Sequence, residues 1–368
     1  MSVKRFLIDS TSRRLGDTML GLALAPMIKY KWPDSKVHFA CGQYETRFFR
    51  RVKVIDDVVI QSIFSAHQGN WNQYEAIIRT CFDVDDKWDY DGFFGGLDNP
   101  EGWKEVLSKG YDLSLSKSRL QKGRVFNVLN KMSPDKKKVG IFCSTPRKDI
   151  SHPFEFSHLS LEKQKEIIKS VLDLGHEVIL FNGIFEQSIP NVEGAYLLPR
   201  LSLEEEGTLF QYLDLLISPS TMVPDMLAPL FKLPTIVLHS CDEFGGGVWA
   251  GIPDSCVLPN LRYQTFCRMD GSEISYVKPP DGSRVVDWDF SHYWLGSKYK
   301  RKMRVIDDIP IDEIIKEIKN KLNGNFGREF FVNKEEPCKS CELFQKFGKC
   351  IYHWSDEYLP ELNGKKWR

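Results

Sequence analysis

The sequence predicts an α/β protein with two halves, each built on a parallel β-sheet covered by helices. Short apolar segments of strand length alternate with helical segments through residues 4–79, and the alternation begins again at residue 138. This pattern is typical of parallel sheets, because consecutive parallel strands need a crossover connection, usually a helix. A polar run containing proline at residues 132–138 separates the two series, and we expect it to be the hinge between two domains.

The first half opens with a strand over residues 4–9, followed by a polar turn and a helix over residues 17–30. That helix is expected to end at Trp32 and Pro33, because proline disfavours helical geometry in the residue before it. Further apolar runs predict strands over residues 36–40, 52–60 and 76–79.

The second half begins with an apolar strand over residues 139–143 and a helix over residues 160–174 that Gly175 caps. Beyond residue 240 the pattern loosens into loops rich in glycine, proline and aromatic residues, until an amphipathic helix at residues 311–322. Between these, strands are expected over residues 177–181, 195–198, 213–217 and 235–238, and helices over residues 203–212 and before residue 232.

The composition is that of a folded globular protein. The 368 residues are 42% hydrophobic and 27% charged, which excludes a disordered chain, and the length favours two or three folding units. Lys plus Arg and Asp plus Glu are both 50, so the bulk charge does not support a protein dedicated to coating nucleic acid.

No segment has the pattern of a signal peptide or a membrane span, since the longest candidate, residues 209–238, is interrupted by prolines and charges. We expect a cytoplasmic protein that is not integral to a membrane, and a peripheral position at a membrane surface stays open. Reduced thiols are expected at the six cysteines without framework spacing, which are Cys41, Cys81, Cys143, Cys241, Cys256 and Cys267.

The loops that follow the predicted strands are the candidate functional sites. Ligands of open parallel sheets bind beyond the carboxyl ends of the strands, where helix N-termini offer backbone N–H groups. After the first strand, Gly16 permits close backbone approach, and Asp17 either caps the following helix or faces a cleft as a base. After the strand at residues 139–143, Ser144, Thr145, Arg147 and Lys148 suit a diphosphate, although the alternative is a solvated basic turn.

Three segments of the first half carry a family signal: RLGD at residues 14–17, Ala25-Pro26 one helix later, and KWPDSKV at residues 31–37. Together they resemble the opening of the heptosyltransferase-like glycosyltransferases of lipopolysaccharide synthesis. The resemblance implies a GT-B-like fold, with two Rossmann-like domains facing across a cleft. In that family the Asp after the Gly is the base that acts on the acceptor hydroxyl, a role that falls here to Asp17.

The resemblance extends to the second half. The family has a loop of Ser or Thr with Lys near the donor phosphates, as at residues 144–148, and a turn of small residues near the donor base, as at Asn182 and Gly183. Residues 217–228 resemble its second diagnostic segment, which implies that Ser220 and Thr221 lie at a helix N-terminus beside phosphate.

That second segment departs from the family pattern. The family usually has an Asp-Ser/Thr-Gly run and a histidine on the next helix, whereas Thr221 and Met226 occupy the nearest positions here. Asp225 is either a contact to a donor ribose or a charge at a helix start. This departure bears on which donor and acceptor the protein uses more than on its fold.

The resemblance implies a glycosyltransferase that moves a sugar from a nucleotide-sugar donor to an acceptor hydroxyl, and the loops described above agree with it. No catalytic divalent metal is expected, because no Asp-X-Asp cluster stands where one would be needed. Basic runs at residues 47–53 and 298–304 suit an anionic acceptor, such as a glycan, a lipid-linked glycan or nucleic acid, or are solvated faces. The alternatives are transfer onto a modified nucleic-acid base and a catalytically degenerate GT-B module that acts as a binding protein.

The last segment carries a second, independent motif. Cys338, Cys341, Cys350 and His353 have the spacing C-x2-C-x8-C-x2-H, which is typical of a closed, structural zinc site; partly buried thiols are the alternative. The expected domains are residues 1–132 on the acceptor side, residues 133–310 binding the donor, a helix within 311–332 and the Cys/His tail at 333–368.

Overall fold

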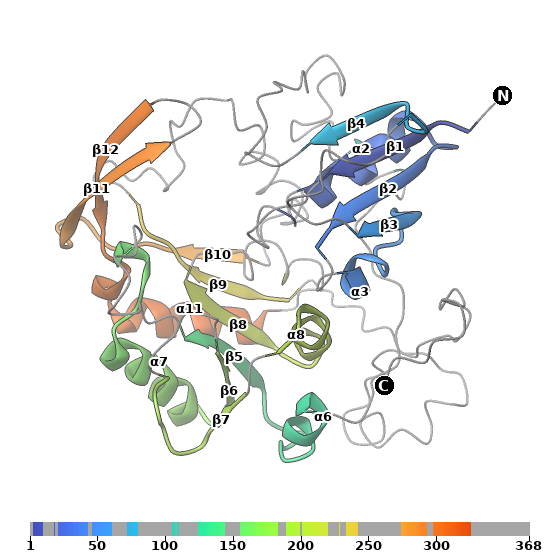
Figure 1. Cartoon of the computed structure of the whole chain (residues 1–368). Coiled ribbons are helices and arrows are strands. Elements are labelled where there is room, and N and C mark those ends of the chain that lie inside the picture. The colour runs from blue at the N-terminus through green and yellow to red at the C-terminus, as the bar shows by residue number, and fades with distance from the viewer. Residues whose placement is uncertain are drawn as a thin grey trace.

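The structure is a computed structural model with two parallel sheets, each flanked by helices (Figure 1). It describes residues 3–9, 18, 21–42, 46–60, 72–79, 105–106, 109, 124–143, 155–182, 189–198, 201–219, 228, 233–241, 274–292 and 297–324.

The first sheet has the strand order β3-β2-β1-β4, and all its strands are parallel. One face packs on helices, because alternate side chains such as Phe6, Ile8 and Phe39 point into a buried apolar cluster. Its strands are β1 (Arg5–Asp9), β2 (Lys36–Cys41), β3 (Asp57–Ile60) and β4 (Ala76–Arg79), and its helices include η1 (Gly21–Ala23), α2 (Leu24–Lys31) and α3 (Thr46–Phe49).

The second sheet has the strand order β10-β9-β8-β5-β6-β7, again all parallel. This is the doubly wound order, in which the chain changes direction across the sheet between β5 and β8. Its strands are β5 (Lys138–Cys143), β6 (Glu177–Asn182), β7 (Ala195–Leu197), β8 (Leu215–Pro219), β9 (Thr235–Leu238) and β10 (Ile274–Val277).

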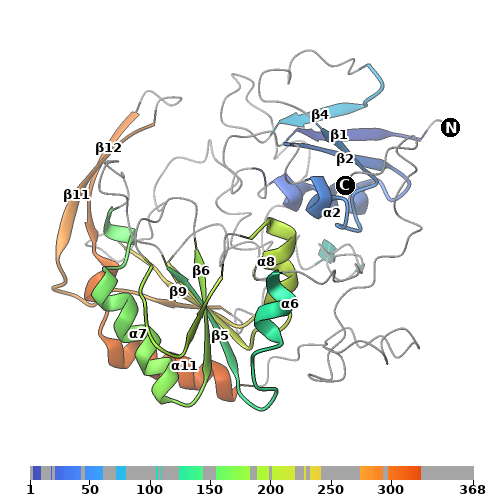
Figure 2. The same ribbon diagram turned by 60° about the horizontal axis from the view of Figure 1, so that its bottom comes forward.

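Helices cover both faces of the second sheet (Figure 2). On one face, Val139 and Ile141 of β5 pack with Ile167 of α7 (Leu161–Asp173) and Ile314 of α11 (Ile311–Asn323). On the other face lie α6 (Arg124–Leu129) and α8 (Leu203–Phe210). With both faces covered, the central strand β5 is buried along its whole length.

Gly140 of β5 packs so closely that a side chain has no room. A Cβ atom there would lie 2.6 Å from Leu213 Cδ1 and 2.9 Å from Phe181 Cε2. Phe181 is buried and stacks on Phe142 with ring centroids 4.6 Å apart. The glycine therefore allows an aromatic ring to lie across the centre of the sheet.

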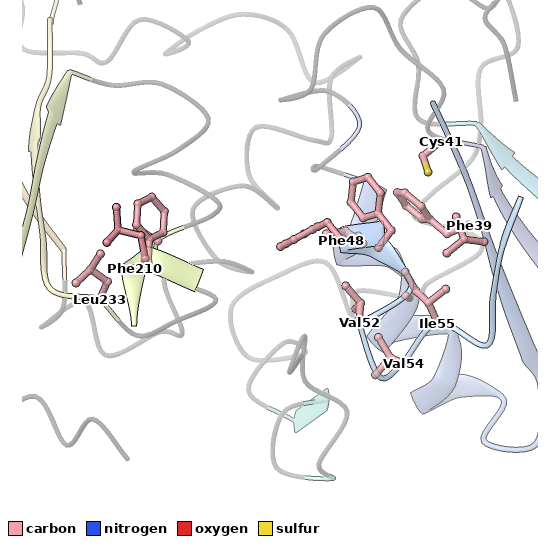
Figure 3. Packing of buried hydrophobic residues seen from close by; sticks show 14 of the residues in the cluster. Phe39, Cys41, Phe48, Val52, Val54, Ile55, Phe210 and Leu233 are labelled. Atoms are coloured by element: carbon pink, nitrogen blue, oxygen red, sulfur yellow. The ribbon is translucent and has the colours of Figure 1, made fainter. Parts of the chain in front are cut away.

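The two halves meet at α3 and α8, which are in contact. Phe48 of α3 and Phe210 of α8 belong to one buried apolar cluster that also contains side chains from both sheets (Figure 3). The basic run at residues 47–53 therefore includes core positions, since Phe48, Phe49 and Arg51 are buried while Arg47 and Lys53 are exposed.

Most predicted elements are confirmed, but the expectation of loops from residue 240 to 310 is wrong. This stretch contains β10 and an antiparallel hairpin of β11 (Val285–His292) and β12 (Ser297–Arg304). The basic run at residues 298–304 is thus a strand. Its register places Lys302 opposite Asp287, and opposite charges across a strand pair are generally favourable.

The hairpin is anchored by a small cluster of its own. Trp288 and Met303 are buried against Phe156, with the Trp288 and Phe156 rings edge to face at 5.6 Å. Ser240, after β9, donates from its hydroxyl to the carbonyl oxygen of Arg304 at 2.7 Å. The hairpin thereby joins the end of β9 to the segment that leads into α11.

Asp56 joins α2 to the start of the strands β2 and β3. Its carboxylate accepts hydrogen bonds from Lys29 Nζ at 2.6 Å, the Val37 N–H at 2.8 Å and Lys36 Nζ at 2.9 Å. Burial raises the pKa of Asp56, but the bonds from Lys29, Val37 and Lys36 outweigh it, so that this pKa lies below its ordinary value.

The Asp56→Asn variant is expected to lose about 0.5–1.5 kcal/mol of unfolding free energy at pH 7, because water screens the ion pairs of this partly exposed carboxylate. A lowered folded-state pKa stabilises the protein above the unfolded-state pKa and ceases to do so as the pH falls through the folded-state value. The difference in unfolding free energy between the wild type and the variant should therefore decrease below about pH 4. Urea unfolding at pH 7 and at pH 3 measures the two unfolding free energies. Asp34→Asn, in the exposed turn before β2, is the control. A stability difference between Asp56→Asn and wild type that persists at pH 3 contradicts the prediction.

Candidate functional site

The carboxyl edge of the second sheet is the candidate donor site. Cys143, the last residue of β5, pairs in register with Asn182, the last residue of β6. On its other side β5 pairs with β8, with Ile141 opposite Ile217, and β8 ends two residues later at Pro219. Three strands thus end side by side at the point where the doubly wound order reverses, which is where ligands of such sheets bind.

The candidate donor residues follow directly on these strand ends. Asn182 is the last residue of β6. The other candidates lie outside the described residues, and they are Ser144, Thr145, Arg147, Lys148, Gly183, Ser220, Thr221 and Asp225. The structure therefore places the starting point of each candidate loop and leaves the loop geometry a prediction.

Two buried polar residues at this edge escaped sequence reasoning. His239 and Ser240 follow β9, the strand next to β8, and are 4% and 0% exposed. The His239 N–H donates to the Val277 carbonyl at 2.9 Å, and its ring meets Tyr276 edge to face at 5.5 Å. The available signal was a polar pair directly after the apolar strand TIVL.

The candidate acceptor-side loop follows β1, the first strand of the other sheet. In the order β3-β2-β1-β4 the direction reverses between β1 and β4, so the carboxyl end of β1 is again at a switch point. Gly16 and Asp17 lie outside the described residues, while Thr18 is helical and buried. A helical Thr18 is consistent with Asp17 at the start of a helix.

Asp9 is a second carboxylate at this edge that sequence reasoning missed. It is the last residue of β1, is 5% exposed and lies in register between Ala40 of β2 and Arg79 of β4. An acidic residue that ends a buried apolar strand was the signal that could have found it.

A histidine–tyrosine pair of the first sheet lies away from this edge. His38 Nδ1 and the Tyr74 hydroxyl are 3.0 Å apart, near the amino ends of the strands. Burial lowers the pKa of His38, which Asp57 and Asp56 partly oppose, and burial raises the pKa of Tyr74. At neutral pH His38 is therefore an uncharged ring that pairs with a neutral phenol.

The tail that carries Cys338, Cys341, Cys350 and His353 lies outside the described residues. Within the part of the chain that the structure describes, no three His, Cys, Asp or Glu side chains gather in a way that could hold a metal ion. The zinc site therefore stays a prediction. The helices in that same part include none long and apolar enough to cross a membrane.

Comparison with solved structures identifies the architecture. A family 9 glycosyl transferase from Veillonella parvula is similar over 88% of this chain and 98% of its own, with a TM-score of 0.54 and 11% identity. The ADP-heptose lps heptosyltransferase II of E. coli is similar over 87% of this chain and 98% of its own, with a TM-score of 0.50 and 13% identity. The chain shares the fold of these two glycosyltransferases.

This shared fold and the two parallel sheets confirm the prediction of an α/β protein with two parallel-sheet halves. No family model matches the sequence, and no curated protein is significantly similar to it. At such low identity the likeness shows the fold alone.

Proposed function

We propose that this protein is a glycosyltransferase that moves a sugar from a nucleotide-sugar donor to an acceptor hydroxyl. The observation that carries the proposal is the adjacency of β5 and β8, which end together at the switch point of a doubly wound sheet. The loop with Ser144, Thr145, Arg147 and Lys148 starts from one of these ends, and the loop with Ser220 and Thr221 starts from the other. In this proposal the diphosphate binds between these two loops, which both carry hydroxyl groups and of which the first also carries two cations.

The chemistry divides between the two halves. In the transfer, the carboxylate of Asp17 removes the proton of the acceptor hydroxyl, the acceptor oxygen forms a bond to the anomeric carbon, and the bond from that carbon to the diphosphate breaks. The electron pair of the broken bond leaves on the diphosphate, where Arg147, Lys148 and the hydroxyls offset the added negative charge. Asn182 and Gly183 are proposed to contact the donor base, and Asp225 its ribose.

The domain assignment follows the same division. Residues 1–132 are assigned to the acceptor side and residues 133–310 to the donor side, except that α6 (Arg124–Leu129) packs on the second sheet and is counted with the donor side. Gly16 lets the backbone approach the substrates beside Asp17. We propose that the acceptor is anionic, with the exposed Arg47 and Lys53 as candidate contacts, and that the Cys/His tail holds a structural zinc ion. The protein works without a catalytic divalent metal, since cations of the chain itself balance the leaving group.

Removal of the two cations tests the donor site. The double variant Arg147→Ala/Lys148→Ala is expected to bind ADP or UDP, whichever nucleotide the wild type prefers, at least about tenfold more weakly, because each charge-assisted hydrogen bond contributes about 1.5–3 kcal/mol. Isothermal titration calorimetry measures the affinity. The control is Lys316→Ala/Lys319→Ala on the exposed side of α11, which removes the same charge elsewhere.

The same experiment separates the alternatives. Equal nucleotide affinity in the double variant and the wild type contradicts this donor site. If the wild type binds neither a nucleotide nor a nucleotide sugar, the result supports the alternative of a catalytically degenerate module that acts as a binding protein. Steeply salt-dependent DNA binding, together with transfer onto a modified base, identifies the nucleic-acid acceptor.

A further inference from the structure

The hairpin of β11 and β12, which we call the arm, is a two-stranded ribbon that begins at the carboxyl edge of the second sheet. The eight residues of β11 pair in register with the eight of β12, from Val285 opposite Arg304 to His292 opposite Ser297. At about 3.4 Å per residue the ribbon is about 25 Å long. Its outer end stands away from both parallel sheets in two views of the molecule (Figures 1 and 2).

Hydrogen bonds fix the base of the arm beside the end of β9. The Arg304 N–H donates to the Cys241 carbonyl at 2.8 Å, and the Ser240 hydroxyl donates to the Arg304 carbonyl at 2.7 Å. The two strands are closed at this end by the Val305 N–H, which donates to the Arg284 carbonyl at 3.0 Å. Because β9 lies next to β8, the arm begins beside the edge that carries the proposed donor site.

Ion pairs and apolar packing fix the direction of the arm. Arg284 Nη2 lies 2.6 Å from Asp308 Oδ1, and Arg304 Nη1 lies 2.6 Å from Asp281 Oδ1. The apolar cluster around Phe156 holds one face of the same end. An arm held on several sides in this way keeps one direction relative to the second sheet.

The sequence of the arm is strongly basic. β12 has five Lys or Arg among its eight residues and no Asp or Glu, whereas β11 has two Asp and no Lys or Arg, which leaves three net positive charges. From Lys298 to Arg304 every second residue is basic, and alternate residues of a strand share a face. Lys302 is exposed and the adjacent Met303 is buried, so the basic row and the buried face alternate as this pattern requires.

A basic ribbon of this shape matches the major groove of double-stranded DNA. That groove is about 12 Å wide and admits a two-stranded β-ribbon, whose strands are about 4.8 Å apart. A length of about 25 Å spans about seven base pairs, each of which adds two phosphate charges. A membrane surface is flat, and proteins that lie on one present a broad face with apolar side chains beside the cations. Duplex RNA fits less well, because its major groove is narrow and deep.

We propose that the arm binds double-stranded DNA through phosphate contacts of the basic row of β12. The net charge of zero excludes broad coating of DNA by the whole surface, whereas the arm concentrates positive charge on one element. DNA bound there lies beside the carboxyl edge of the second sheet, where the arm begins. The inference does not depend on the proposed reaction, because DNA binding is measured without a sugar donor.

Fluorescence anisotropy of a labelled DNA duplex of about 20 base pairs, titrated with the full chain from about 50 to 200 mM KCl, tests the arm. The Lys298→Gln/Lys300→Gln/Lys302→Gln variant should bind at least about tenfold more weakly at the lowest salt concentration. Each lost phosphate contact lowers the slope of log affinity against log salt by about 0.9, so the slope should fall by about two to three.

The matched control is Lys169→Gln/Lys316→Gln/Lys319→Gln, which removes the same charge from exposed positions of α7 and α11 and should keep the wild-type affinity. Asp287→Asn/Asp289→Asn raises the net charge of the arm and should bind the duplex about threefold more tightly or better. This second variant keeps the test decisive if the lysine variant fails to fold. Circular dichroism checks the fold of all three variants.

Other polyanions separate DNA from competing partners. Duplex RNA of the same sequence should bind more weakly than the DNA, and equal affinity overturns the assignment to the DNA groove. A wild-type chain that binds vesicles of phosphatidylcholine and phosphatidylserine but not the duplex, or that binds neither at low salt, overturns the proposal. A folded lysine variant with the affinity of the control overturns it as well.

Discussion

Asp17→Asn is expected to lower the rate of sugar transfer by about 10²–10⁴-fold, the usual contribution of a general base. Asparagine caps a helix about as well as aspartate, so the helix that contains the buried Thr18 should keep its start. The substitution therefore separates the two roles that the sequence leaves open for Asp17. Initial rates with the nucleotide sugar that the wild type uses measure the effect.

Three control measurements accompany Asp17→Asn. Its thermal midpoint and its nucleotide affinity should both equal those of the wild type, because the proposed donor contacts lie in the other half. Asp34→Asn, which removes a carboxylate from an exposed turn of the same half, should keep the wild-type rate. An unchanged rate in Asp17→Asn identifies Asp17 as a cap, and Asp9, buried at the end of β1, then becomes the carboxylate to replace.

Phe181→Ala is expected to lower the free energy of unfolding by about 3–5 kcal/mol, the range for removing a large aromatic side chain from a core. The ring is 2% exposed, stacks on Phe142 at 4.6 Å and meets Phe210 at 5.6 Å. It lies against Gly140, so its removal leaves a cavity at the centre of the second sheet. Urea unfolding measures the loss.

Gly140→Ala supplies an internal check on this packing. Alone it should destabilise the protein, because the added Cβ meets Leu213 and Phe181. In the Phe181→Ala background, Gly140→Ala should lower the free energy of unfolding by less than it does in the wild type, because the contact between the added Cβ and the Phe181 ring is absent. Leu197→Ala, at a side chain that is 54% exposed, is the surface control and should stay within about 0.5 kcal/mol. Strict additivity of the Gly140 and Phe181 changes would contradict the close approach.

The sequence predicts the buried strands well, because such strands are short apolar runs between polar turns. The strands at Ala76–Arg79 and Thr235–Leu238 have the predicted bounds, and Gly175 has the positive φ of 85° expected of a glycine after a helix. Within residues 52–60, only Asp57–Ile60 is a strand.

The hairpin was missed because its stability depends on partners far away in the chain. The run KYKRKMR has only one strongly apolar residue, Met303, and reads as a charged surface. It becomes a strand because it pairs along its whole length with β11 and because Phe156, far earlier in the chain, packs on Trp288 of β11. Neither pairing leaves a local signal.

The site could be predicted only as a set of loops. Which loops adjoin depends on strand order, and the adjacency of β5 and β8 becomes visible only in the sheet. The same limit explains why Asp9 and His239 escaped notice. Each follows directly on an apolar run, and its position at the carboxyl edge of a sheet gives that weak sequence signal its meaning.

The pairing of β5 with β8 also has a consequence for biosynthesis. β5 cannot complete its second row of strand hydrogen bonds until β8 has left the ribosome, well after β6 and β7 have been made. Pairings between distant parts of a chain slow folding and prolong the exposure of apolar strand edges. Refolding from denaturant is therefore expected to be slow and prone to aggregation, and production at low temperature or with chaperones should increase the yield.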